Sequence, residues 1–457
     1  MNRSPIPGEE KSAETAPLPV SLVVAVISCG MMFRAFDGSW GQALSCLLNT
    51  CLLAAALWKA PPGLDFWRRG KIVLGLVAGA IFWVTAITFL TLDAFPDYAL
   101  GKLLSLISGF SALLIGALMS RGRRKRRAIL DWLLLFNTLF LVAGLLFREA
   151  GVEVMLPFWT LERMGRFTGV AGNANVTAAV AACCAIIAVA RLLGTTRGLI
   201  QSWGDQSGIT HSLFVPLAVL PIGVVVITAS RFTAIVMSVV ILAYLFDWLI
   251  KRRRKMIWRI LSIGVGVIGA GWFLTSDLVL RQRFSSIGAS NDDRLSAWTH
   301  LLEVAMQRPF TGYGLGSFPS VHAHFLTTPR FAQADWAWNS PHNLFLQLML
   351  QGGLPYLALL LSAVGVGAVQ TTRLLRGRWT RDHVLVVVLL IVLVSCAMVD
   401  LVLDMPAPVT LAMFLAGSLW GQAINRPEVG VVAAGDDPFG HEPAIGFGAS
   451  HGVEHAV

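Results

Sequence analysis

Long uncharged apolar runs recur along almost the whole chain, and they restrict the fold more than any other feature. Hydrophobic residues make up 55% and charged residues only 14% of the 457 residues, whereas about a quarter of a soluble domain is charged. Runs of about 20 apolar residues are long enough to cross a bilayer as helices. The sequence therefore indicates an all-α polytopic membrane protein. It excludes a water-soluble enzyme, a disordered protein and a disulfide scaffold.

The apolar runs predict twelve membrane-spanning helices between two polar segments, 1–17 and 426–457. The first segment lacks the short basic start of a signal peptide, so the first span is expected to stay in the membrane. The second segment has almost no apolar periodicity and is predicted to be disordered. The transmembrane domain, 18–425, contains two long outer loops at about 148–173 and 277–341, the larger one between helices nine and ten. The predicted spans are 18–36, 41–58, 72–91, 99–119, 128–147, 174–194, 211–229, 232–250, 256–276, 343–370, 384–403 and 407–425.

The basic residues give the orientation. The net charge is +10, and its densest clusters are RGRRKRR at 121–127 and KRRRK at 251–255. Both clusters, with most of the other Lys and Arg, face the cytoplasm if both termini are cytoplasmic, as the positive-inside rule favours. The charge therefore serves orientation in the lipid bilayer and does not indicate nucleic acid. Any chemistry is then expected at the outer membrane boundary, in the two long loops and the neighbouring helix ends.

A histidine lies at the start of the tenth predicted span, in Ser340-Pro341-His342-Asn343. Ser at the N-cap and Pro at the first helical position are typical helix-start signals, which place His342 in the first turn. The positive end of a helix disfavours imidazolium, and a neutral imidazole can accept a proton from a hydroxyl. Free N–H groups there also attract anions such as pyrophosphate. Spacing alone favours the alternative, an interfacial histidine that only caps and anchors the helix.

His342-Asn343, nine residues and then Gly353-Leu354-Pro355-Tyr356 match the pattern H-[NSQ]-x9-G-x-x-[GTY]. This pattern resembles the signature of the bacterial O-antigen ligases and related lipid-linked-glycan polymerases. Further resemblances cover roughly 160–425. They are Ser230-Arg231, similar to the family's SR element; Asp293 to Trp298 leading into Pro309 to Gly316, similar to its R…W…P…G-x-G stretch; and Gly172-Asn173-Ala174-Asn175, similar to an N-P-N element. One departure is Ile235, where the ligase pattern R-x3-L has Leu, which weakens the case for a ligase over a polymerase.

The resemblance implies a GT-C-like glycosyltransferase of the bacterial inner membrane with a periplasmic active site. The donor would be a glycan on undecaprenyl pyrophosphate, and the acceptor lipid A-core, in lipopolysaccharide biosynthesis, or another glycan. The reaction would invert the anomeric carbon without a metal or other cofactor. His342 would take the acceptor's proton while Arg231 and Arg294 neutralise the leaving pyrophosphate. The candidates for binding pyrophosphate or glycan are Arg166, Arg163, Asn343 and Trp298.

Several alternatives remain open at this stage. The protein could be an O-antigen or exopolysaccharide polymerase on the same carrier, or a ligase acting on a protein hydroxyl. A transporter also suits twelve spans, but transporters usually place ionisable residues near the bilayer midplane, and the midplanes here are nearly uncharged. Trp298 either stacks on a sugar or belongs to an interfacial aromatic belt. Asp400 and Asp404, at the outer end of the eleventh span, could bind an arginine or the acceptor, and Gly352, Gly353 and Pro355 should kink their helix.

Overall fold

Membrane-length helices form a bundle, and one further helix lies across one of its ends. The structure is a computed structural model that describes residues 18–33, 35, 38–94, 98–120, 123–152, 154–155, 159–160, 162–163, 166–193, 207–251, 287–325 and 340–425. Within these residues, eight helices are long and apolar enough to cross a membrane. The predicted all-α polytopic class is therefore confirmed.

The helices follow the predicted spans in order. All the predicted spans correspond to helices except 256–276, which lies outside the described residues, so the count of twelve stays a prediction. The helices are α1 (Val20–Cys29), η1 (Gly30–Met32), α2 (Ser39–Lys59), α3 (Leu64–Thr91), α4 (Ala99–Met119), α5 (Arg123–Glu149), α6 (Ala174–Leu193), α7 (Ser207–Ile227), α8 (Arg231–Lys251), α11 (Ile287–Gln307), α12 (Phe318–Phe325), α14 (Leu344–Leu374), α15 (Arg381–Ala397), η4 (Val402–Asp404) and α16 (Pro406–Ile424).

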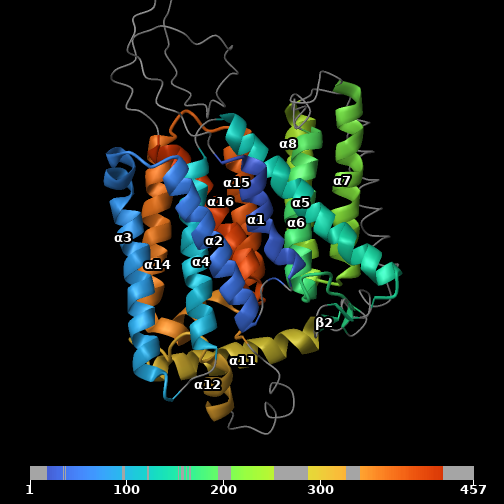
Figure 1. Cartoon of the computed structure of the whole chain (residues 1–457). Coiled ribbons are helices and arrows are strands. Elements are labelled where there is room, and N and C mark those ends of the chain that lie inside the picture. The colour runs from blue at the N-terminus through green and yellow to red at the C-terminus, as the bar shows by residue number, and fades with distance from the viewer. Residues whose placement is uncertain are drawn as a thin grey trace, which may run out of the picture.

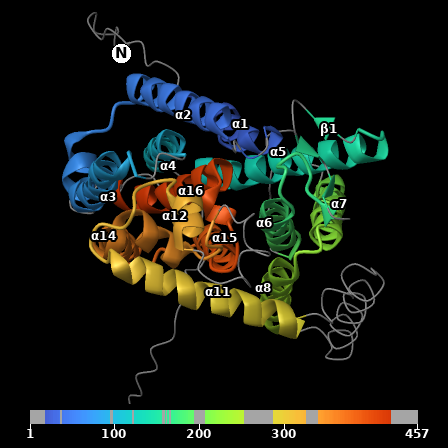
Figure 2. The same cartoon turned by 90° about the horizontal axis from the view of Figure 1, so that it is seen from below.

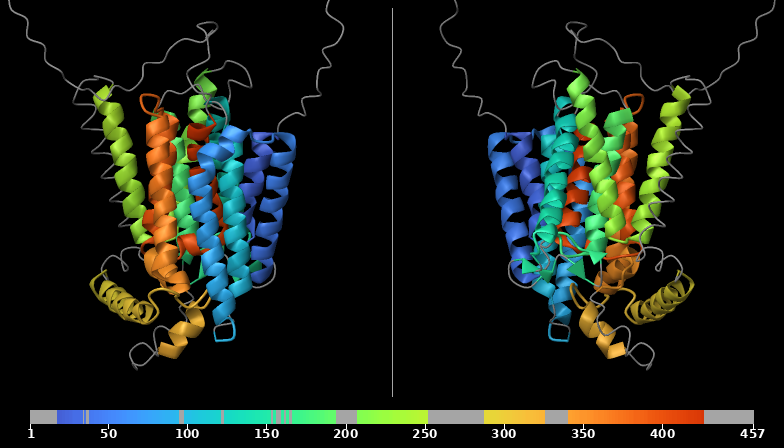
Figure 3. Two further views of the ribbon diagram at one scale, coloured as in Figure 1. Left: turned by 90° about the vertical axis from the view of Figure 1, so that its left-hand side faces the viewer. Right: turned by 90° about the vertical axis from the view of Figure 1, so that its right-hand side faces the viewer.

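The described parts of both predicted outer loops lie at the same end of the bundle (Figures 1 and 3). The shorter loop contributes two antiparallel strand pairs, β1 (Val154–Met155) with β2 (Trp159–Thr160) and β3 (Glu162–Arg163) with β4 (Arg166–Phe167). The longer loop contributes α11 and α12. Figure 2 shows α11 crossing beneath the bundle from α8 to α14. This end of the bundle therefore gathers the segments in which chemistry is expected.

Small residues bring the central helices α4 and α16 into close contact. A side chain added at Gly116 would overlap the backbone carbonyl of Phe414, and one added at Gly421 would overlap the backbone of Ala117. In a bilayer, where lipid is as apolar as a leucine side chain, such close backbone approach is a main source of helix association. The α4–α16 pair therefore forms the tightly packed centre of the bundle.

A buried ion cluster joins helices at the end of the bundle opposite α11. The Arg191 guanidinium in α6 donates to Asp131 of α5 and to Asp382 of α15, each at 2.7 Å. Arg126 of α5 lies 3.6 Å from the second carboxylate oxygen of Asp382. Buried charges in membrane proteins require such partners. The described part of the basic run 121–127 thus contributes to packing as well as to charge.

The predicted kink in α14 is confirmed at Gly353, whose φ of 70° and ψ of −172° lie outside the helical region. Pro355 lacks an N–H, so the carbonyl of Gln351 loses its intrahelical donor. The N–H of Gly314 donates to this carbonyl instead, at 2.9 Å. The kink is therefore completed by a segment outside the helix.

Two further hydrogen bonds fasten the same segment to the kink. The N–H of Tyr313 donates to the carbonyl of Leu350, and the N–H of Leu354 donates to that of Pro309, each at 2.7 Å. Backbone groups freed inside a membrane helix need such partners. The Pro309–Gly316 motif and the His342 motif are therefore one structural unit, although they are separated in sequence.

Candidate active site

The helix that follows His342 begins later than the sequence predicts. The N-cap of α14 is Asn343, whose side chain accepts a hydrogen bond from the N–H of Leu346 at 3.1 Å. His342 has a left-handed φ of 50° and cannot continue a helix. The predicted N-cap at Ser340, with Pro341 at the first helical position, is therefore wrong. His342 lies outside the first turn, so the helix-dipole argument for its neutrality does not hold.

His342 instead faces a carboxylate. Its Nδ1 lies 3.3 Å from Oδ1 of Asp400, in the segment between α15 and η4, and its side chain is 20% exposed. A strained backbone angle at a half-buried histidine is typical of a functional position. A carboxylate at one ring nitrogen orients the imidazole and leaves proton exchange to the other nitrogen. The pair has the arrangement of a general base with its orienting partner.

Asp400 connects His342 to an arginine. The amide of Asn175 donates to Oδ2 of Asp400, and the carbonyl oxygen of the same amide accepts from Nη2 of Arg166 at 2.6 Å. Arg166 also donates from Nε to the carbonyl of Thr228 at 2.9 Å. The structure thus joins Arg166, Asn175, Asp400 and His342 in one hydrogen-bonded line, which we call the His342–Arg166 line.

The G-N-A-N motif sets the position of Asn175. The side-chain oxygen of Asn173 accepts from the N–H groups of Asn175 and Val176, at 2.9 and 3.1 Å. This is the N-cap arrangement that starts α6 at Ala174. Asn175 consequently lies in the first turn of a buried helix, where its side chain reaches both Arg166 and Asp400.

Arg231 is the first residue of α8 and follows the turn that holds Arg166. Ser230, in this turn, donates to the hydroxyl of Thr233 in α8 at 3.0 Å. The Thr233 hydroxyl in turn lies 3.5 Å from the Cys396 thiol of α15. These contacts fasten the start of α8 to the end of α15, four residues before Asp400. The predicted SR element therefore lies at the same end of the same helices as the His342–Arg166 line.

The remaining predicted residues lie in α11, in β3 and at the N-cap of α14. Trp298 donates from its indole nitrogen to the carbonyl of Pro341 at 3.0 Å, so it holds the segment before His342. Arg294 lies four residues earlier in α11, about one turn away, and only its backbone is described. Arg163 likewise has a described backbone, which pairs with Arg166. Asn343 caps α14.

We expect Asp400→Asn to lower kcat by up to about 10⁴-fold, as when the carboxylate that orients a general-base imidazole and stabilises the imidazolium becomes an amide. The amide keeps the shape of the side chain but loses the negative charge facing His342. Steady-state transfer kinetics would measure the effect, with exposed Glu303→Gln in α11 as the matched control. Unchanged kcat in Asp400→Asn would show that Asp400 only joins helices.

Comparison with known proteins agrees with the predicted resemblance. Residues 216–361 match the model of a family described as O-antigen ligase. This part of the chain is similar to the O-antigen ligases. The family indicates a glycosyltransferase-like membrane enzyme that acts on lipid-linked glycans. No curated protein matches the chain.

The matched range covers Ser230, Arg231, Trp298 and His342 but excludes part of the site. Arg166 and Asn175 precede it, and Asp400 follows it. The O-antigen ligase-like segment therefore supplies the histidine, while Arg166 comes from β4, Asn175 from α6, and Asp400 from the segment between α15 and η4. The sequence singled out Asp400 as a possible partner of an arginine or the acceptor but missed its contact with His342, since its only signal was an acidic side chain at the outer end of a span.

Proposed function

We propose that the protein is an O-antigen ligase, which moves a glycan from undecaprenyl pyrophosphate to a hydroxyl of lipid A-core. The observation that supports this proposal best is the His342–Arg166 line. It connects a proton acceptor to a guanidinium through one amide and one carboxylate. A metal-independent glycosyl transfer needs these two kinds of group close together, one for the attacking hydroxyl and one for the leaving pyrophosphate.

In this proposal His342 acts as the general base. The acceptor hydroxyl attacks the anomeric carbon while the bond from that carbon to the phosphate oxygen breaks. The hydroxyl proton passes to Nε2 of His342, because Nδ1 faces Asp400. The carboxylate stabilises the imidazolium as it forms. Attack from the side opposite the leaving group inverts the anomeric carbon, and undecaprenyl pyrophosphate is released.

Arginines neutralise the charge that develops on the pyrophosphate. A guanidinium presents several N–H donors in a planar fork and stays charged at all relevant pH values. We assign this role to Arg231 and Arg294, with Arg166 and Arg163 in support. Arg166 is held in position by Thr228 and Asn175 before any substrate binds. Preorganised charge of this kind stabilises a transition state strongly.

We propose that the His342 end of the bundle faces the periplasm and that both termini face the cytoplasm. Arg126 and Arg191 lie at the opposite end, where they pair with Asp131 and Asp382. The positive-inside rule counts Lys and Arg even where acidic residues accompany them, so these arginines support the orientation. The full architecture would have about twelve membrane-spanning helices in a GT-C-like bacterial inner-membrane enzyme.

Transfer by the purified protein in lipid vesicles tests the function. The donor is a glycan on undecaprenyl pyrophosphate, the acceptor is lipid A-core, and each reaction is run with and without EDTA. We expect glycosylated lipid A-core at the same rate in both, because arginines take the place of a metal. Loss of transfer in EDTA, restored by a divalent cation, would contradict the arginine mechanism. Lengthening of the carrier-bound glycan with lipid A-core unchanged would indicate a polymerase.

A further inference from the structure

The start of α3 and the end of α14 meet at the end of the bundle opposite His342, and the proposed mechanism does not use them. The two helices lie side by side (Figures 1 and 2) and run antiparallel. The amide of Gln370 in α14 donates to the carbonyl of Arg69 in α3 at 2.6 Å, and its oxygen accepts from the indole of Trp420 in α16 at 2.8 Å. Residues next to Arg69 and residues one turn beyond Gln370 are therefore neighbours in space, although 301 positions separate Arg69 from Gln370 in the sequence.

Five exposed cations gather where these segments meet. They are Arg68 and Lys71 in α3 and Arg373, Arg376 and Arg378 at the end of α14 and just after it. None of the five forms an ion pair among the described residues. The described segments 63–73 and 370–378 contain one exposed carboxylate, that of Asp65 in the first turn of α3. The described residues therefore leave most of this positive charge uncompensated, and we call the region the α3–α14 basic surface.

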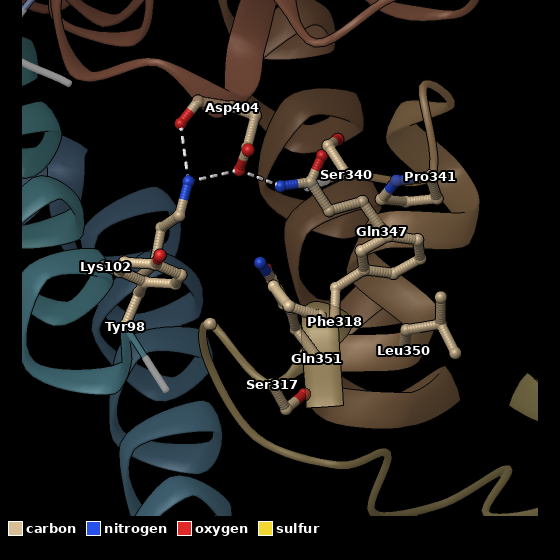
Figure 4. Close-up of a pocket in the computed structure, with 12 residues that line it drawn as sticks. Tyr98, Lys102, Ser317, Phe318, Ser340, Pro341, Gln347, Leu350, Gln351 and Asp404 are labelled. Carbon is tan, nitrogen blue, oxygen red and sulfur yellow. Dashed lines mark hydrogen bonds and ion pairs between the residues drawn. The ribbon is translucent and has the colours of Figure 1, made fainter. Parts of the chain in front are cut away.

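Cations inside the bundle have protein partners instead. The Lys102 ammonium lies 2.6 Å from the carboxylate of Asp404, which also accepts from the amide of Gln347 (Figure 4). Arg191 is held by two carboxylates in the buried ion cluster described above. A charge at a bilayer is costly unless another charge or a polar group meets it. The α3–α14 basic surface therefore leaves its charges to be met from outside the protein.

An open apolar face continues from Arg68 along α3 toward the middle of the bundle. Ile72, Gly75 and Gly79 follow Arg68 at the spacings that place residues on one side of a helix. Ile72 is 56% exposed, and a side chain added at either glycine would meet no atom within 4 Å. A phospholipid carries its charge on the headgroup and has hydrocarbon below it. Cations followed by an open apolar face therefore suit a lipid better than free phosphate.

We propose that the α3–α14 basic surface binds the headgroup of an anionic phospholipid, with an acyl chain along the apolar side of α3. Guanidinium and ammonium groups form strong charge-assisted hydrogen bonds with phosphate oxygens. Basic residues beside membrane helices are attracted to leaflets that contain anionic lipids. Because the cations come from both α3 and α14, one lipid contacts both helices at the end away from His342. The inference is independent of the proposed function, since none of these residues belongs to the His342–Arg166 line.

Native mass spectrometry of the purified full chain tests the lipid site. The protein is kept in neutral detergent and titrated with phosphatidylglycerol, and binding of the first lipid is measured. We expect Arg68→Gln and Arg373→Gln each to weaken this binding about 3- to 5-fold, the effect of losing one cation near an anionic headgroup. Asp65→Asn should strengthen the binding by a similar factor, because it removes a charge that repels the phosphate. Arg308→Gln, at an exposed arginine of the opposite end, is the matched control and should leave the binding unchanged.

Zwitterionic phosphatidylcholine and free glycerol phosphate serve as the comparison ligands. Phosphatidylcholine should bind more weakly than phosphatidylglycerol and equally to all variants, and glycerol phosphate should not displace the bound lipid. Each substituted side chain is exposed, so the variants should fold, and equal melting temperatures without added lipid would confirm this. Unchanged phosphatidylglycerol binding in both arginine variants would overturn the site. Weakening in only one of them would confine the site to one helix and would also overturn the shared surface, as would displacement by glycerol phosphate.

Discussion

Replacing His342 by Gln should lower kcat for glycan transfer about 10²–10⁴-fold, the range for loss of a general base. Glutamine can still form a hydrogen bond toward Asp400, so the segment before α14 keeps its polar contact. It cannot accept a proton from the acceptor hydroxyl, and that step then depends on water. The KM values of donor and acceptor should change little, because the ring is assigned to the reaction step.

The control for this variant is His324→Gln in α12. His324 is exposed at the same end of the bundle and belongs to the same long segment between spans. Its substitution should leave both kcat and KM unchanged. Rates would be taken from the appearance of glycosylated lipid A-core in vesicles that contain equal amounts of folded protein. Wild-type kcat in His342→Gln would reduce His342 to an anchor of its segment.

Replacing Gly116 by Val should destabilise the bundle by about 3 kcal/mol or more, at or above the upper end of the usual overpacking range. The new side chain would overlap the backbone of Phe414, which cannot rotate away as a flexible side chain can. The helices α4 and α16 would have to separate, and this pair forms the centre of the molecule. We expect a lower melting temperature in detergent and a smaller yield of monodisperse protein.

Gly75→Val in α3 is the matched control, since no atom lies within 4 Å of a side chain added there. It carries the same change of residue into another membrane-length helix. Its melting temperature should remain close to that of the wild type. An equal fall in melting temperature in the two variants would mean that valine disturbs any helix of this protein and that the close contact at Gly116 does not contribute specially to stability.

The helices could be predicted from the sequence because the signal is local. A run of about 20 apolar residues identifies a span without knowledge of its neighbours. The start of α14 could not be predicted in the same way. The Ser340-Pro341 pair satisfies the local rules for a helix start, but the left-handed backbone of His342 and the capping by Asn343 move the start to Leu344.

The sequence singled out individual residues of the candidate site, but it could not predict which of them contact one another. His342 and Arg166 were expected from a motif and from charge. The contact of His342 with Asp400 joins residues 58 positions apart, and no spacing rule marks it. Asn175 was part of a recognised motif, yet its bridging position follows only from the packing of α6 against α15. Pairings between helices depend on tertiary contacts that hydropathy does not encode.

The interruption of α14 also has a mechanical consequence. Hydrophobic mismatch with the surrounding lipid tilts the apolar stretch of a spanning helix, at a modest free-energy cost. In α14 that stretch is 356–374, and Gly353 separates it from the turns 344–351. The carbonyls of Leu350 and Gln351, in these turns, accept hydrogen bonds from the N–H groups of Tyr313 and Gly314. The Pro309–Gly316 segment also bonds Leu354, on the far side of Gly353, so it bridges the break. We therefore expect the two parts of α14 to tilt together, so that a membrane of different thickness would move the end that follows His342 as well as the apolar stretch.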